Sequence, residues 1–188
     1  MGNIILFAPR RFGDARGWFS EVFNARREAG NGIHVDFVQD NLSFSARSGT
    51  IRGIHFQRPP HAQAKLVRCS RGRLMDYVVD LRRGSPTYGH HLAAELTAEG
   101  GEQLFIPAGF GHAFITFEPE TEICYKVSDF YDPNCDAGLR WDCPTIAIDW
   151  PDVGEVILSE RDRTLPTLAG FDSPFAYDGQ PMQMIRVE

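Results

Sequence analysis

The chain consists mainly of short apolar runs separated by turn residues. Within several runs apolar and polar side chains alternate with a period of two, which is typical of a strand with one buried face. The strand-like runs are residues 33–38, 49–56, 65–70, 74–81, 91–96, 102–106, 113–117, 122–127 and 147–150. Helical patterns are confined to residues 20–29 and a short turn at 158–162. Many short strands at this spacing predict an all-β, antiparallel jelly-roll barrel with short helical segments near the termini.

One domain is expected for the whole chain. Its 188 residues include 43% hydrophobic and 23% charged residues, as in ordinary soluble domains. We expect N-terminal strands over residues 1–45, a barrel core over 46–150 and a C-terminal tail over 151–188. Inside the core, a glycine-containing turn makes residues 65–70 and 74–81 natural hairpin partners.

The alternation in residues 49–56 makes a prediction about His55. Side chains point to opposite faces at successive strand positions. Ile51 and His55 are therefore expected on one face of the strand, with Arg52 and Ile54 on the other.

Charge and cysteine content restrict the possible function classes. The net charge of −6 argues against a general nucleic-acid binder. The four cysteines form no CxxC pair, which predicts reduced thiols and a cytoplasmic protein. No apolar run approaches the length of a membrane span, and the first run is too short for a secretory signal.

Several kinds of catalytic site lack their usual motifs. The chain has no HxH pair, and the adjacent His90 and His91 would face opposite sides of a strand. It has no GxSxG nucleophile elbow, no GxGxxG fingerprint and no GxxxxGK[ST] phosphate loop. A metal-dependent enzyme remains an alternative that elemental analysis of the purified protein would test.

Proton transfer without a cofactor requires four kinds of group. It needs a base that titrates near neutral pH, a group that holds the base, a cation for the developing oxyanion and an acid on the opposite face. His55, Asp162, Lys65 and Tyr125 are residues of these types. Each of these residue types, taken alone, more often has a structural role, so the residues themselves predict only a barrel with a candidate proton-transfer site.

A series of segments between about residues 12 and 162 resembles the dTDP-4-dehydrorhamnose 3,5-epimerase family. In chain order they are FGDARGWFSE (12–21), VQDNLSFS (38–45), IRGIHFQ (51–57), QAKLVRC (63–69), DYVVDLR (76–82), SPTYG (85–89), IPAGFGHAF (106–114), YKVSDFY (125–131) and IDWP (148–151). The common order of so many segments is far more specific than any single motif.

The resemblance implies a cupin-like jelly roll and an isomerase that needs no cofactor and no metal. Its expected reaction inverts C3 and C5 of a nucleotide-linked 4-keto-6-deoxyhexose through an enolate, converting dTDP-4-dehydro-6-deoxyglucose to dTDP-4-dehydrorhamnose. The implied catalytic residues are His55 as base, Asp162 as the group that holds it, Lys65 as the cation and Tyr125 as proton donor. The implied substrate-binding residues are Arg16, Phe19, Glu21, Gln39, Asn41, Arg52, His112, Asp136, Trp141 and Arg161.

The resemblance also sets expectations for partners and leaves alternatives open. The partner is a nucleotide sugar, not a nucleic acid or a membrane, and a homodimer joined through the N-terminal strands is expected. Rhamnose for polysaccharide biosynthesis is the default pathway. Departures from the family pattern at Asp136, Arg161 and residues 96–101 put the nucleotide and the sugar in doubt. A single-site epimerase acting at C3 or C5 alone and a non-catalytic sugar-nucleotide-binding jelly roll remain alternatives.

Overall fold

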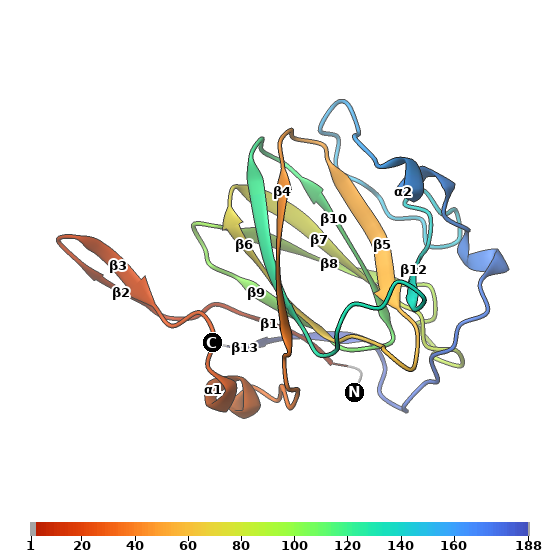
Figure 1. Ribbon diagram of the computed structural model, residues 1–188, viewed down its shortest axis with the longest axis horizontal. Coiled ribbons are helices and arrows are strands. Elements are labelled where there is room, and N and C mark those ends of the chain that lie inside the picture. Colours follow the sequence, from red (N-terminus) through yellow and green to blue (C-terminus); the bar gives the residue numbers. More distant parts are fainter. Residues whose placement is uncertain (1–2, 188) are drawn as a thin grey trace.

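The computed structural model describes residues 3–187, which form two facing β-sheets and a projecting hairpin (Figure 1). The six-stranded sheet has the order β13 (Gln183–Val187), β1 (Asn3–Phe7), β9 (Gln103–Ile106), β6 (Lys65–Arg71), β11 (Thr121–Val127) and β4 (Gln39–Ser45). The five-stranded sheet has the order β12 (Asp136–Gly138), β5 (Ile51–Gln57), β10 (Phe110–Thr116), β7 (Arg73–Asp80) and β8 (His91–Thr97). In both sheets every described pair of neighbouring strands except β1 and β13 is antiparallel. The predicted all-β jelly roll is confirmed.

The main core lies between the two sheets. Alternate residues of each strand point inward, where Val67, Leu104 and Ile123 of one sheet join Leu74 and Leu96 of the other in one buried cluster. These five side chains have no measurable exposure. The packing of alternate residues thus fixes which face of each strand is turned to the interior.

The C-terminal tail covers the outer face of the five-stranded sheet. It contains the short helix α2 (Glu160–Thr164) and the 3₁₀ turn η1 (Leu168–Gly170), both in the blue part of the chain in Figure 1. Ile54 of β5 and Leu81, which follows β7, form a second buried cluster with Phe175 of the tail, called the outer core cluster. In this tail α2 lies beside β5.

The segment around α1 (Ala25–Gly30) covers part of the outer face of the six-stranded sheet. Asn24 caps the helix by accepting hydrogen bonds from the backbone of its first turn. Phe23 and Phe37, on either side of α1, pack edge to face and cover the buried Phe105. No helix within residues 3–187 combines the length and the hydropathy needed to cross a membrane.

The hairpin of β2 (Arg11–Asp14) and β3 (Gly17–Ser20) extends away from the two sheets (Figure 1). Trp18 and Phe19 at its surface are 59% and 68% exposed. Large apolar side chains on a projecting segment are typical of a surface that contacts another molecule.

Four local predictions are wrong. Residues 33–38 and 147–150 form no strand, and their apolar side chains pack on the outer faces of the sheets. β6 and β7 are not a hairpin, because the turn between them carries the chain from one sheet to the other. The N-terminal helix spans only Ala25–Gly30, whereas the predicted helical turn near 158–162 is confirmed as α2.

Candidate active site

Two cavities of about 400 and 440 Å³ meet at His55, Lys65 and Tyr125. The remaining lining residues of the first are Gln39, Asn41, Phe56, Gln57, Gln63, Tyr131, Asp136 and Arg161. The remaining lining residues of the second are Leu42, Ser43, Phe44, Arg52, His112 and Phe114. Both sheets contribute, so the three shared side chains lie where one continuous cleft enters the barrel.

Strand register brings the lining residues together from distant parts of the sequence. On the five-stranded sheet, His112 of β10 lies directly opposite His55 of β5. On the six-stranded sheet, Tyr125 of β11 is paired with Asn41 of β4. On the other side of β11, Lys65 of β6 is paired with Val127, which lies two residues along β11 from Tyr125.

A bulge in β5 overturns the prediction for the face of His55. The pairing with β10 shifts in register at Gly53, which has a φ of +125°. Ile51 and Ile54 consequently share the outer core cluster, while Arg52 and His55 line the same cavity. A side chain at Gly53 would lie 2.6 Å from the Cα of Ala113, so the bulge requires glycine.

His55 is held from behind by Asp162 of α2. Its Nε2 lies 2.6 Å from Oδ1 of the carboxylate, which is almost completely buried. The hydroxyl of Ser159 caps α2 by accepting a hydrogen bond from the Asp162 backbone. Burial opposes ionisation of Asp162, but the hydrogen bond and charge of His55 outweigh it and hold its pKa below the ordinary value. An ionised carboxylate therefore orients the imidazole and stabilises its protonated form.

Lys65 and Tyr125 have pKa values shifted by their surroundings. Burial lowers the pKa of Lys65 to about 8, although Asp76 and Asp136 favour its charged form. Burial raises the pKa of Tyr125, an effect that Arg52 opposes and Asp136 reinforces. At neutral pH the site therefore contains an ammonium ion and a protonated phenol.

His112 is backed by a second carboxylate, that of Asp76, which sequence reasoning missed. The His112 Nε2 and an Asp76 oxygen are 2.8 Å apart, and Asp76 is fully buried. Burial raises the pKa of Asp76, while His112 and Lys65 act in the opposite direction. Its other carboxylate oxygen has no hydrogen-bond partner among residues 3–187. A charged residue within the apolar run of β7 was the available sequence signal.

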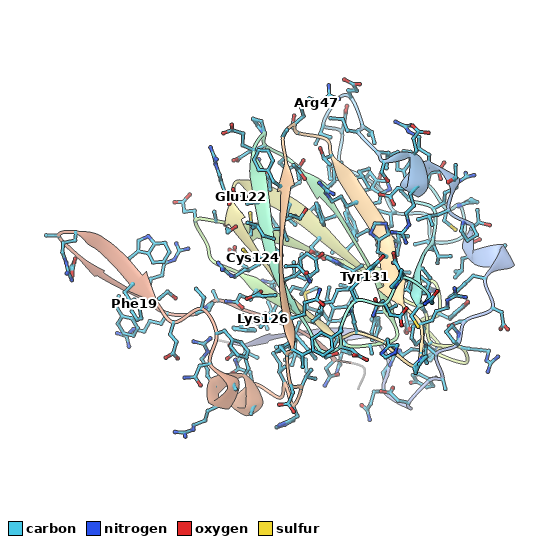
Figure 2. All side chains as sticks on the ribbon, viewed as in Figure 1. Phe19, Arg47, Glu122, Cys124, Lys126 and Tyr131 are labelled. Carbon is cyan, nitrogen blue, oxygen red and sulfur yellow. The ribbon has the colours of Figure 1, made fainter. Side chains whose placement is uncertain are left out.

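The first cavity has a polar wall to which β12, α2 and the loop before β12 contribute. Asp136 forms an ion pair with Arg161 at 2.9 Å and accepts a hydrogen bond from the Tyr131 hydroxyl at 3.2 Å. On β4, the Gln39 amide donates a hydrogen bond to the Asn41 side chain at 2.8 Å. Tyr131 is 56% exposed and lies beside β5 and β12 in Figure 2. Sequence reasoning missed this tyrosine, although it ends one of the segments that carry the family resemblance.

Four predicted binding residues lie outside the two cavities. Arg16 and Phe19 are on the projecting hairpin, and Glu21 follows it directly, far along the molecule from Tyr131 (Figure 2). Arg16 forms its ion pair with Asp14 of the same hairpin. Trp141 packs against Trp150 at the edge of the outer core cluster. Their roles in binding remain predictions.

The protein-family model for dTDP-4-dehydrorhamnose 3,5-epimerase matches residues 1–170. This match covers all of the cavity-lining residues and both carboxylates behind the histidines. The chain belongs to this epimerase family. The resemblance inferred from the sequence is thereby confirmed, and so is the assignment to the isomerases.

Curated relatives of this epimerase match nearly its full length. It is 50% identical over 177 residues to a dTDP-4-dehydrorhamnose 3,5-epimerase from Sinorhizobium fredii, covering 94% of this chain and 91% of the relative. It is 43% identical over 167 residues to the one from Escherichia coli K12, covering 88% and 90%.

Solved structures show the same architecture. A Legionella pneumophila dTDP-6-deoxy-D-glucose-3,5-epimerase in complex with dTDP-4-keto-L-rhamnose has a TM-score of 0.86 and 38% identity, covering 91% of this epimerase and 92% of that chain. A 3'-monoepimerase from Streptomyces bikiniensis in complex with dTDP-quinovose has a TM-score of 0.80 and 35% identity, covering 87% and 83%. The fold is thus common to enzymes named for two inversions and for one.

Proposed function

We propose that this chain converts dTDP-4-dehydro-6-deoxyglucose to dTDP-4-dehydrorhamnose by inverting C3 and C5, with no metal and no organic cofactor. The observation that supports this most directly is the meeting of His55, Lys65 and Tyr125 at one cleft, with Asp162 bound to the imidazole. A base, a cation and a protonated phenol around one volume are what enolate chemistry requires.

The proposed reaction proceeds through two similar proton exchanges. The C4 ketone acidifies the hydrogens on C3 and C5. His55 removes one of them, and the electron pair of the broken C–H bond moves into the enolate, whose oxygen is stabilised by the Lys65 ammonium. Tyr125 then donates its proton to the opposite face of the same carbon, which inverts it. Exchange with solvent restores both residues before the second carbon reacts.

The nucleotide is proposed to extend from the shared centre along the cleft. Arg52 lines the cavity, and its guanidinium donates only one described hydrogen bond, to the Phe44 carbonyl, so it has donors left for the diphosphate. His112, fixed by Asp76, is proposed to contact the hexose. The exposed ring of Tyr131 offers a flat surface on which the nucleobase stacks. Gln39, Asn41, Asp136 and Arg161 complete the polar wall.

We also propose that the protein is a homodimer. The aromatic residues Phe12, Trp18 and Phe19 of the hairpin are more than half exposed, and β4 is an edge strand with exposed Leu42 and Phe44. A second copy that covers these surfaces would allow Arg16, Phe19 and Glu21 to act on its cleft. Sedimentation as a stable monomer would overturn this proposal. A cytoplasmic location is proposed as well, supported by the four free cysteines.

Proton NMR of dTDP-4-keto-6-deoxyglucose in D₂O tests the proposed reaction. We expect the wild-type protein, without added metal, to remove both the C3 and the C5 proton signals, and His55→Ala to remove neither. Loss of one signal only would establish a single-site epimerase, the second candidate, which the structural similarity to a 3'-monoepimerase favours. No exchange with the wild-type protein would contradict the proposal and indicate another substrate or a binding role.

A further inference from the structure

The wall segment 128–132, which carries Tyr131, is held in place by side chains of other segments. The Gln57 amide donates to the carbonyls of His61 and Phe130 and accepts a hydrogen bond from the Asp132 backbone. Gln63 donates to the Asp129 carbonyl at 2.8 Å. On the strand side, the Tyr131 backbone donates to the Gln39 side chain at 3.1 Å. These neutral hydrogen bonds fix the path of the segment.

His61 adds contacts with two carboxylates to this neutral framework. Its Nδ1 lies 3.1 Å from an Asp129 oxygen, and its Nε2 lies 3.6 Å from an Asp132 oxygen. Asp129 lies two residues before Tyr131, and Asp132 lies directly after it. The ring of His61 lies between the two carboxylates, with Nδ1 within hydrogen-bond distance of Asp129 and Nε2 turned toward Asp132.

We propose that His61 is a positioning residue for nucleotide binding. Its contacts with Asp129 and Asp132 set the orientation in which the Tyr131 ring stacks on the nucleobase of the substrate. This inference rests on the proposed function, because it assigns the Tyr131 surface to the nucleotide. His61 does not line either cavity at the catalytic centre. Its loss should therefore weaken binding and leave the proton transfers at His55 and Tyr125 unchanged.

The geometry also separates positioning from folding. The His61 side chain is 42% exposed, and the hydrogen bonds of Gln57, Gln63 and Gln39 do not involve its ring. Truncation of the imidazole leaves the neutral framework in place, so the melting temperature should be preserved. Exposed ion pairs have modest strength, and we expect the KM to rise by about two- to fivefold.

The experiment is a double-mutant cycle on the full-length protein. His61→Ala, Asp129→Asn and the double variant are compared for kcat and KM with dTDP-4-keto-6-deoxyglucose and for the Kd of dTDP by calorimetry. His90→Ala, which truncates an exposed histidine outside residues 57–63 and 128–132, is the matched control. His61→Lys places a cation near the two carboxylates and tests whether a positive charge restores binding.

The proposal predicts that both single variants raise KM and Kd together at constant kcat and melting temperature. The KM and Kd of the double variant should be no higher than those of the more strongly affected single variant. His61→Lys should recover part of the lost affinity. Unchanged KM and Kd in His61→Ala, or fully additive losses in the double variant, would overturn the inference. Should His61→Ala lower the melting temperature, Asp129→Asn decides by the same criteria. An inactive wild-type protein would instead refute the proposed function, and the Kd of dTDP would still test the role of His61.

Discussion

Replacing Asp162 by asparagine removes one negative charge from behind His55 and changes little else. The two side chains have nearly the same shape, and the backbone hydrogen bond to Ser159 that starts α2 is retained. What is lost is a charge-assisted hydrogen bond of 2.6 Å between a buried carboxylate and the imidazole. In the wild-type protein this carboxylate is ionised at neutral pH, because its pKa lies below the ordinary value.

The expected loss of rate follows from the strength of such a hydrogen bond. Hydrogen bonds to charged groups contribute about 1.5–3 kcal/mol, which corresponds to a rate loss of about 10- to 150-fold if the bond is made fully only when His55 carries the proton. The assay is the initial rate of deuterium incorporation at C3 and C5, followed by proton NMR. The expected loss is in kcat, with KM nearly unchanged, because Asp162 does not line the cavities.

Asp142→Asn is the matched control, since that carboxylate pairs with Arg140 on the surface. Its rate should stay at the wild-type value. An Asp162→Asn rate within twofold of wild type, together with an inactive His55→Ala variant, would refute the reasoning. In that case His55 would act as a base without needing the carboxylate.

Three further predictions concern the cation, the bulge and the core. Because Lys65 has a pKa of about 8, it is charged below that pH and neutral above it, so kcat should fall as the pH rises through this value; a pH–rate profile with no alkaline fall would contradict the role of its ammonium. Gly53→Ala should unfold at a lower temperature and bind substrate poorly, because the new methyl group would meet Ala113 and the His112 carbonyl at 2.6 Å; calorimetry of the variant tests this. Leu104→Ala should lower the free energy of unfolding by about 2–5 kcal/mol, measured in urea, because it leaves a cavity in the inter-sheet core.

Much of the fold follows from local patterns in the sequence. Seven of the nine predicted strand runs correspond to strands, because alternation and turn residues are properties of neighbouring positions. The two failures, residues 33–38 and 147–150, show the limit of this reasoning. An apolar side chain that packs on the outside of a sheet gives the same pattern as one within a strand. The assignment of β6 and β7 to different sheets likewise depends on long-range pairing, which no local pattern contains.

The sequence by itself determined the family, the residue types of the proton-transfer set and the overall class of fold, because ordered segments and periodicity are written directly in the chain. Only the tertiary structure decided how these residues meet. The bulge at Gly53 places His55 on the same side of β5 as Arg52, facing the cavity. Helix α2 brings Asp162, which is 107 positions away in the sequence, to the imidazole. The tertiary structure also revealed Asp76 behind His112 and Tyr131 in the cavity wall. Their importance depends on burial and on neighbours distant in sequence, and these exist only once the two sheets have packed together.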